Sequence, residues 1–164
     1  MKKILVIIIS IVLFNGCSIA NTPTSKVEEY LSRYQRVDND VSLSYLQLSI
    51  DENISDENKK NYQNLIKDQY RNLSYEIKEE KIDGDTATVI AQVKVTNYKE
   101  ILDKYDKTNY DDINEYHKLV IESMETQKDK IIYTVDFELN KNSNDEWEVS
   151  SLSTKEREKL LGIN

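Results

Sequence analysis

The chain has 164 residues, a formal net charge of −8, three glycines, one proline and a single cysteine. The acidic charge argues against a surface for nucleic acid or anionic lipid, because phosphates and carboxylates repel each other. A single cysteine excludes an internal disulfide, and the scarcity of glycine and proline argues against a long flexible linker. We therefore expect one domain that is stabilised by packing.

The N-terminal segment contains the only long apolar run of the chain. Two lysines precede the 11-residue stretch 4–14, and Cys17 follows it closely. This order is typical of an export signal, and the stretch is shorter than the about 20 apolar residues that span a bilayer. It resembles the signal peptide of a bacterial lipoprotein, although Leu13 lies four residues before the cysteine and the usual leucine lies three before it. We predict that residues 1–16 are removed and that Cys17 is lipidated.

The predicted lipid anchor places the protein at the outer side of a cell membrane. The cysteine thiol would carry a diacylglycerol and the freed amine a further acyl chain such as palmitate. Each buried methylene contributes about 0.8 kcal/mol, so two or more chains hold firmly. Loss of the signal peptide changes the formal net charge from −8 to −10, because it removes two lysines. We expect residues 17–24 to form the lipidated cysteine and a short tether, and residues 25–164 to form a single extracytoplasmic domain.

Helical periodicity begins after the tether. Thr24 or Ser25 is expected to cap a helix just after Pro23. The apolar stripe of this helix consists of Val27, Tyr30, Leu31 and Tyr34. Residues 41–50 fit a helix face or a strand, and we favour a short helix. Ser55 is expected to cap a further helix, whose inward positions are Tyr62, Leu65, Ile66, Gln69, Tyr70 and Leu73.

The hydrophobic period then changes from helical to alternating, which predicts strands. Tyr75 and Ile77 share a face, Ile82 falls out of phase with them, and a bulge near residues 79–81 would restore the phase. An Asp-Gly pair at 83–84 predicts a hairpin turn. The inward face of the next strand consists of Ala87, Val89, Ala91, Val93 and Val95.

A helical insertion, residues 99–130, separates this strand from the last two. Asp111 or Asp112 is expected to begin its second helix. The apolar positions of the insertion are Tyr98, Ile101, Leu102 and Tyr105, followed by Ile113, Tyr116, Val120 and Met124. Strands return at 131–140, with odd-numbered residues inward, and at 146–152. A last helix is expected to begin at a capping box at Ser153 and to end at Gly162.

Helices followed by an antiparallel sheet with one helix-covered face predict an α+β fold. The segments 75–77, 82–89, 132–137 and 147–149 resemble those of small lipoproteins of Gram-positive bacteria with a domain like nuclear transport factor two, also called cystatin-like. This resemblance implies N-terminal helices packed on a curved antiparallel sheet that forms a cone, with a helical insertion between strands. Such folds serve isomerases, dehydratases, small-molecule binders and interaction modules, so the fold does not decide the function.

The candidate chemical residues favour structural roles. His117, the only histidine, is expected at the flank of an apolar helix face as a partly exposed residue, and Asp136 and Glu138 as solvated strand charges. No Ser-His-Asp arrangement or glycine-rich phosphate loop is present. The acidic clusters at 38–40 and 51–57 lack the spacing of an EF-hand calcium loop. We predict no enzyme activity, no catalytic residue, no metal and no cofactor.

Two functions remain open. We favour a non-catalytic interaction or accessory module of the cell envelope that meets another envelope protein and binds no nucleic acid. The alternative is a lipoprotein that binds a lipid-like molecule or a cell-wall fragment in the cone. The residues expected to line such a pocket are Ala87, Val89, Ala91, Tyr133, Val135, Phe137 and Trp147. The insertion 99–130 either covers the mouth of the cone or stands free as a docking surface.

Overall fold

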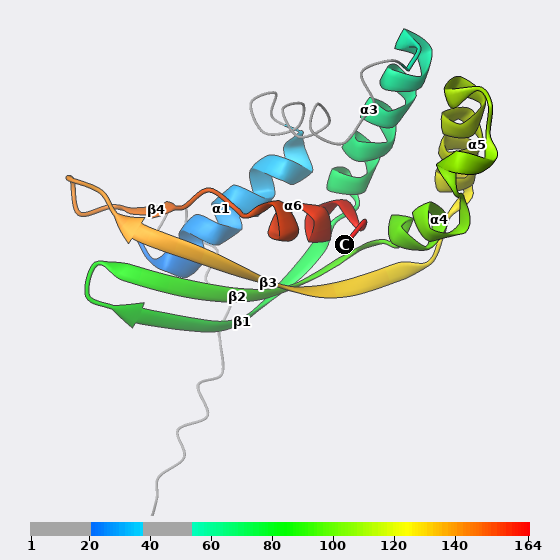
Figure 1. Cartoon of the computed structure of the whole chain (residues 1–164). Helices are drawn as coiled ribbons and strands as arrows, with labels where there is room; N and C mark the ends of the chain where they lie inside the picture. Colours follow the sequence, from blue (N-terminus) through cyan, green and yellow to red (C-terminus); the bar gives the residue numbers. More distant parts are fainter. Residues whose placement is uncertain (1–20, 38–53) are drawn as a thin grey trace, which may run out of the picture.

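A computed structural model describes residues 21–37 and 54–164 of the chain (Figure 1). The predicted signal peptide, Cys17 and the predicted short helix at 41–50 lie outside the described residues. In chain order the elements are α1 (Pro23–Arg36), α3 (Asp56–Arg71), β1 (Ser74–Asp83), β2 (Thr86–Thr96), α4 (Tyr98–Lys104), the 3-10 turn η2 (Lys107–Asn109), α5 (Ile113–Thr126), β3 (Lys130–Lys141), β4 (Trp147–Val149) and α6 (Thr154–Leu161).

The strands form one antiparallel sheet in the order β1-β2-β3-β4. Helices α1 and α6 pack on one face of this sheet, and α3 and α5 stand side by side at its end (Figure 1). The insertion between β2 and β3 supplies α4 and α5. The predicted α+β arrangement, with helices on one face of an antiparallel sheet and a helical insertion between strands, is confirmed.

One face of the sheet forms the main core with α1 and α6. The inward residues of β2 are at most 5 % exposed, as their alternation predicts. Val135, Phe137 and Leu139 continue this layer on β3, and Leu31 and Leu160 cover it from the helices. Because these side chains are aliphatic or aromatic and almost wholly buried, the main core holds the sheet and the two helices together.

Several local predictions are confirmed, and three differ in position or length: the start of α1, the bulge in β1 and the extent of β4. The predicted caps at Ser55, Asp112, Ser153 and Gly162 and the turn at Gly84 all occur. Helix α1 instead begins two or three residues earlier, because its N-cap is Thr22 in place of Thr24 or Ser25. Thr22 and Ser25 form a capping box, and Pro23 takes the first helical position, where its missing N–H costs nothing. The bulge in β1 lies between Ile77 and Glu79, just before the predicted position, and β4 is shorter than predicted.

A second hydrophobic cluster lies beyond the sheet. The N-terminal part of α3 forms this region together with α4 and α5, and we call the whole region the helical arm. Its buried residues are Leu65, Tyr98, Tyr116, Val120, Ile121 and Met124. Figure 1 shows α3 and α5 projecting away from the strands. Helix α3 belongs to both regions, because Leu65 packs in the arm and Tyr70 packs in the main core.

The two regions meet at a buried amide. Gln69 Nε2 donates to the backbone oxygens of Thr96 and Leu161, both at 2.9 Å, and Gln69 Oε1 accepts from Thr96 N at 2.9 Å. Gly162 adopts a left-handed conformation beside this amide, and a Cβ there would lie 2.0 Å from Thr96 O. The end of β2, the middle of α3 and the end of α6 are therefore joined at one point.

Candidate functional site

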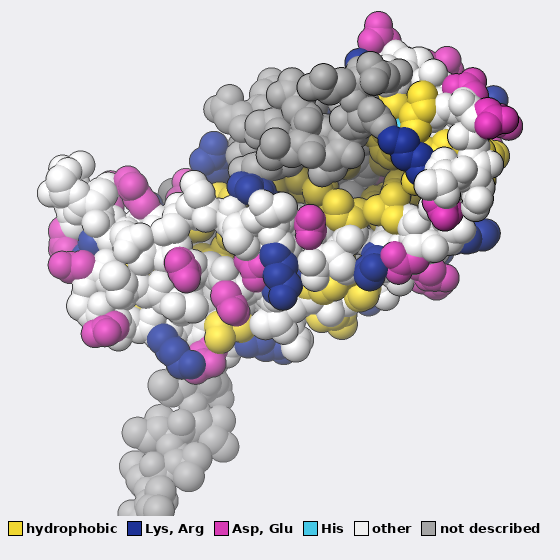
Figure 2. Space-filling view, in the orientation of Figure 1, with side chains coloured by type: hydrophobic (Ala, Val, Ile, Leu, Met, Phe, Trp, Pro, Cys, Tyr) yellow, Lys and Arg dark blue, Asp and Glu magenta, His cyan; other side chains and the backbone are white. Residues whose placement is uncertain are grey.

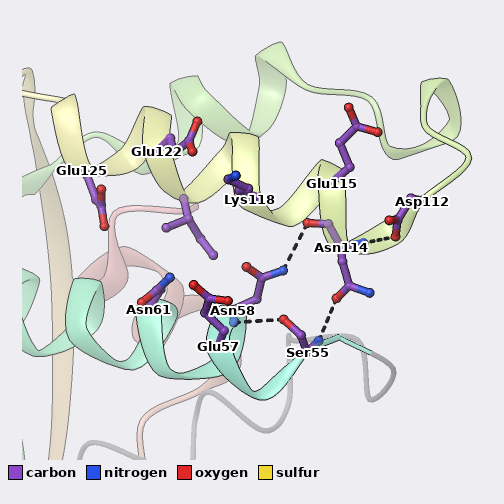
Figure 3. Close-up of a pocket in the computed structure, with 11 residues that line it drawn as sticks. Ser55, Glu57, Asn58, Asn61, Asp112, Asn114, Glu115, Lys118, Glu122 and Glu125 are labelled. Atoms are coloured by element: carbon purple, nitrogen blue, oxygen red, sulfur yellow. Dashed lines mark hydrogen bonds between the residues drawn. The ribbon is translucent and has the colours of Figure 1, made fainter.

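A groove of about 510 Å³ runs between α3 and α5 in the helical arm (Figure 3). Its walls carry one cationic side chain, Lys118, and five carboxylates. The carboxylates are Glu57, Asp112, Glu115, Glu122 and Glu125. Acidic side chains also gather over the free ends of α3 and α5 in the space-filling view (Figure 2). The groove therefore presents mainly negative charge and hydrogen-bond acceptors to solvent.

The groove is positioned by hydrogen bonds between the first turns of α3 and α5. Ser55 caps α3 by accepting from Asn58 N at 3.2 Å, and Asp112 caps α5 by accepting from Asn114 N at 2.8 Å. The two caps are joined, because Ser55 N donates to Asn114 Oδ1 at 2.7 Å and Asn58 Nδ2 donates to Asn114 O at 3.1 Å (Figure 3). The two helices thus begin side by side and hold the groove open at a fixed width.

The carboxylates at the start of the two helices have a local structural explanation. Glu57 lies in the first turn of α3, Glu115 lies in the first turn of α5, and Asp112 is the N-cap of α5. The partial positive charge of a helix N-terminus stabilises acidic groups at these positions. Their presence by itself does not point to a ligand.

Glu122 and Glu125 have no such explanation. They lie in the last turns of α5, which carries no basic residue in its last turn. A helix C-terminus bears partial negative charge, and two glutamates three residues apart also repel each other. Among the described residues, no ion pair involves Glu122, Glu125 or Lys118. This end of the groove therefore carries unbalanced negative charge.

Asn58 places a further acceptor in the groove. The residue is only 6 % exposed, and its side-chain nitrogen is used in the bond to Asn114 O. Its carbonyl oxygen Oδ1 accepts no hydrogen bond within the described part of the chain and lies on the groove side (Figure 3). This oxygen is not among the buried side-chain atoms of the described residues that lack a hydrogen-bond partner, so solvent reaches it.

The position of His117, in contact with Tyr62 of α3, corrects a prediction. We expected a partly exposed side chain, but His117 is only 9 % exposed because α5 packs against α3. Its Nδ1 lies 2.9 Å from the Tyr62 hydroxyl, and its ring meets those of Tyr62 and Tyr116 edge-on. Burial raises the pKa of Tyr62 well above its ordinary value, with a smaller contribution from Tyr116. The pair is part of the interior of the arm.

The residues predicted to line a cone pocket lie in the main core. Tyr133 is partly buried and its hydroxyl donates to Asn164 O at 2.6 Å. The other six are at most 5 % exposed and pack against each other and the helices: Ala87, Val89, Ala91, Val135, Phe137 and Trp147. Their side chains serve packing here, so a ligand among them stays a prediction. Asp136 and Glu138 are exposed on the opposite face, as predicted.

The described residues offer neither a cluster of metal ligands nor a membrane-spanning helix. In the described ranges 21–37 and 54–164, no group of three or more His, Cys, Asp or Glu side chains is arranged to hold a metal ion. The acidic residues at 38–40 and 51–53 lie outside those ranges. No helix of the described residues is both long and apolar enough to cross a membrane. The predicted absence of catalysis, metal and cofactor stays a prediction.

Comparisons with known proteins add little to this geometry. No protein-family model matches the chain, and no curated protein matches it. Among solved structures, the fold is similar to the crystal structure of ycdA from Bacillus subtilis, provisionally described as a lipoprotein, with 20 % sequence identity and a TM-score of 0.43. The match covers 66 % of this chain and 38 % of ycdA. We take no function from it, and the resemblance to nuclear transport factor two stays a prediction.

The sequence analysis missed the groove, although one signal was available. Glu122 and Glu125 sit three residues apart near the end of a predicted helix, where basic residues are favoured. A local rule broken without compensation is typical of a functional position. The partnership of Asn58 and Asn114 across the groove had no sequence signal, because these residues are 56 positions apart and meet only when α3 packs on α5.

Proposed function

We propose that the protein is a lipid-anchored, non-catalytic interaction module at the outer side of a bacterial cell membrane, and that the helical arm meets its partner. The observation that carries this proposal is the arm itself. It is built from the insertion together with part of α3, it has its own hydrophobic cluster, and it projects from the sheet (Figure 1). Among the described residues the main core contains none from α4 or α5, so the packing of the sheet does not account for the insertion.

The N-terminal sequence supports the anchoring part of the proposal. Two lysines, an apolar stretch and Cys17 stand in the order of a lipoprotein signal. Helix α1 begins at Pro23, six positions after this cysteine. A fully extended tether of that length spans about 20 Å, so the domain would stay close to the membrane surface while its negative charge repels anionic lipid.

Crosslinking in intact cells tests the interaction part. We expect one envelope protein to be captured repeatedly by the native lipoprotein and identified by mass spectrometry. Glu122→Lys on the exposed side of the arm should reduce the capture, whereas Glu138→Lys on the exposed face of β3 should leave it unchanged. Capture of background proteins only, or equal capture by both variants, would contradict the proposed role of the arm.

The anchor has its own test. Cys17→Ala should abolish metabolic labelling with radioactive palmitate and leave an uncleaved precursor. Cys17→Ser is the matched control that keeps the size and polarity of the side chain, and it should fail in the same way because its hydroxyl is not a substrate for thioether formation. Labelling that persists in either variant removes the lipoprotein part of the proposal.

A further inference from the structure

We infer that β1 pairs edge to edge with β1 of a second copy of this chain, in an antiparallel arrangement that continues the sheet across a two-fold axis. This surface is separate from the helical arm, so the inference goes beyond the proposed function. It depends on the open edge of β1, on the bulge in that strand, and on a charge order that is complementary to itself.

The outer edge of β1 is open. The strand comes first in the sheet order and pairs with β2 from Ser74 to Asp83, so its other edge points away from the sheet (Figure 1). Within residues 21–37 and 54–164, no backbone hydrogen bond joins this edge to another segment. The opposite edge of the sheet is β4, which has only three residues. The N–H and C=O groups of β1 therefore form the longer edge on which another strand can pair.

The bulge in β1 decides which of its residues share a face. Lys78 is the extra residue, so odd-numbered positions face the helices before it and even-numbered positions after it. The helix-facing positions, each opposite an inward residue of β2, are Tyr75, Ile77, Glu80 and Ile82. In a two-fold antiparallel pair, each residue lies opposite one that points to the same face. Tyr75 can therefore lie opposite Ile82 of the second copy, with the two bulges opposed at the axis.

The outward face of β1 carries a self-complementary charge order. Lys78 Nζ lies 2.6 Å from Glu76 Oε2, and Lys81 Nζ lies 3.0 Å from Glu79 Oε1, so the four side chains lie along this face. With the bulges opposed, Glu76 lies opposite Lys81 of the second copy. Lys78 then lies opposite Glu79 of the second copy. Every direct pair of charges across the axis has opposite signs, and such cross-strand pairs stabilise a sheet.

The neighbouring registers are disfavoured. A shift by one residue would place helix-facing side chains opposite outward ones. A shift by two residues places Glu76 opposite Glu79 in one direction, and Lys78 opposite Lys81 in the other. Like charges directly opposite each other are destabilising. Charges and bulges on an edge strand generally prevent pairing, but here they oppose the adjacent registers and permit one.

The pairing also covers exposed apolar surface. Ile82 is 56 % exposed, and in the described ranges only Ile132 is a comparably exposed large hydrophobic residue. Tyr75, which would lie opposite Ile82, is itself only partly buried. Contact between an aromatic and a β-branched side chain directly opposite each other stabilises an antiparallel pair. Each copy contributes both residues, so the two-fold axis makes this contact twice.

The start of α1 is compatible with two copies in one membrane. Thr24 N donates to Glu80 Oε2 at 2.8 Å, so α1 begins beside the centre of the paired strands. A two-fold axis normal to the sheet places this point at the same height in both copies. Where Cys17 is lipidated as proposed, both anchors then reach one bilayer. Anchoring in one membrane raises the effective concentration of the copies, which favours a contact as narrow as a strand edge.

Cysteine crosslinking of the full-length chain in cell membranes tests the register. Glu76→Cys with Lys81→Cys places thiols opposite each other in the two copies, whereas within one copy they lie about 16 Å apart, too far for a disulfide. Oxidation with copper phenanthroline should give mostly a dimer on a non-reducing gel. Glu76→Cys with Asp83→Cys is the matched control for the shifted register and should give less than about one fifth of that dimer. The unchanged protein, whose one cysteine is Cys17, gives the background.

Charge reversal tests the pairing without new cysteines. Sedimentation equilibrium of the full-length protein in density-matched neutral detergent measures the dissociation constant of the dimer, and circular dichroism checks folding. Glu76→Lys should weaken the dimer by about tenfold, because it creates two like-charge contacts with Lys81. Adding Lys81→Glu restores opposite charges, and the constant should return to within about threefold of the unchanged protein. Glu148→Lys, exposed on β4, is the control and should change it by less than about twofold.

Several results would overturn the inference. A dimer that Glu76→Lys does not weaken forms through another surface. A chain that stays monomeric in detergent and gives no disulfide in membranes does not pair through β1. Equal disulfide yields from the two cysteine variants contradict the register, and a disulfide to a different protein shows that β1 pairs with another chain. The proposed function is judged separately, because Glu76→Lys leaves the arm unaltered and should not change capture of the envelope partner.

Discussion

The main core and the helical arm are built from different kinds of side chain. The main core consists largely of aliphatic residues that are wholly buried on β2 and β3. Tyrosines make up a larger share of the smaller arm cluster than of the main core, which also contains Tyr34 and Tyr70, and the arm also buries Asn58 and His117. In the described residues, every buried polar side chain lies in the arm or at its junction with the sheet. The sheet region is thus a scaffold, and the arm holds polar groups beside a groove.

This difference predicts unequal stability. Aliphatic burial contributes about 25 cal/mol for each Å² removed from water, whereas a buried polar group contributes only when its hydrogen bonds are complete. Regions with fewer buried apolar contacts open locally at a lower free energy than the rest of a protein. We expect the arm to open before the sheet.

The largest effect is expected from cavities made in the two regions. Phe137→Ala in the main core should lower the free energy of unfolding by about 4 kcal/mol, and Val120→Ala in the arm by about 2 kcal/mol. Hydrogen exchange should increase throughout the molecule for Phe137→Ala but mainly in α4 and α5 for Val120→Ala. If Val120→Ala lowers protection equally in β2 and β3, the two regions form one cooperative unit.

The junction provides the next test. Gly162→Ala places a Cβ 2.0 Å from Thr96 O at a left-handed φ of 74°, and it should cost about 3 kcal/mol. Gly84→Ala is the matched control, because its φ of 60° is also left-handed but no atom lies within 4 Å of the added Cβ. The control should cost about 1 kcal/mol. If urea unfolding shows the same loss of unfolding free energy for both variants, the contact with Thr96 is unimportant.

The amide at the junction is expected to have a smaller effect. Gln69→Leu removes three hydrogen bonds and leaves the N–H and oxygen of Thr96 and the oxygen of Leu161 without this partner. The expected loss is about 2 kcal/mol, with earlier opening of the arm in hydrogen exchange. Gln92→Leu on the exposed sheet face is the control, and it should change stability by less than about 0.5 kcal/mol. If the amide hydrogens of the arm exchange as slowly in Gln69→Leu as in the unchanged protein, Gln69 does not couple the arm to the main core.

The smallest effect is expected from alkaline pH. Burial raises the pKa of Tyr62, Tyr98 and Tyr116 above their ordinary values in the arm, and it does the same for Tyr75 and Tyr133 beside the sheet. A tyrosine with a raised pKa in the folded state stabilises that state fully below the unfolded pKa of about 10. This contribution to stability is lost as the pH rises through the folded pKa.

Because tyrosines make up a larger share of the arm cluster than of the main core, we expect the arm to loosen before the sheet above about pH 10. Tyrosinate absorbance reports ionisation, and the fluorescence of Trp147, the only tryptophan, reports the sheet region. Absorbance should change at a lower pH than fluorescence. Coincident transitions would indicate that both regions unfold together. Tyr62→Phe should bring the absorbance transition closer to that of the unfolded chain.

The sequence predicted local structure well where one segment contains the whole signal. The alternation of β2, the caps at Ser55 and Ser153, and the left-handed end at Gly162 depend on residues a few positions apart. The start of α1 was placed late because Thr22 and Ser25 form a capping box around Pro23, and a cap after the proline was equally plausible from composition.

The sequence by itself determined the α+β class, the inward faces and the predicted export signal, because these follow from periodicity and from short motifs. Only the tertiary structure decided that His117 is buried, that Asn58 faces Asn114 across a groove, and that Glu80 accepts hydrogen bonds from Thr24 at the start of α1. These contacts join residues about 55 positions apart or more, or depend on how α3 packs on α5. No local pattern encodes them, since they form only when the packing of the hydrophobic faces sets the distances between segments.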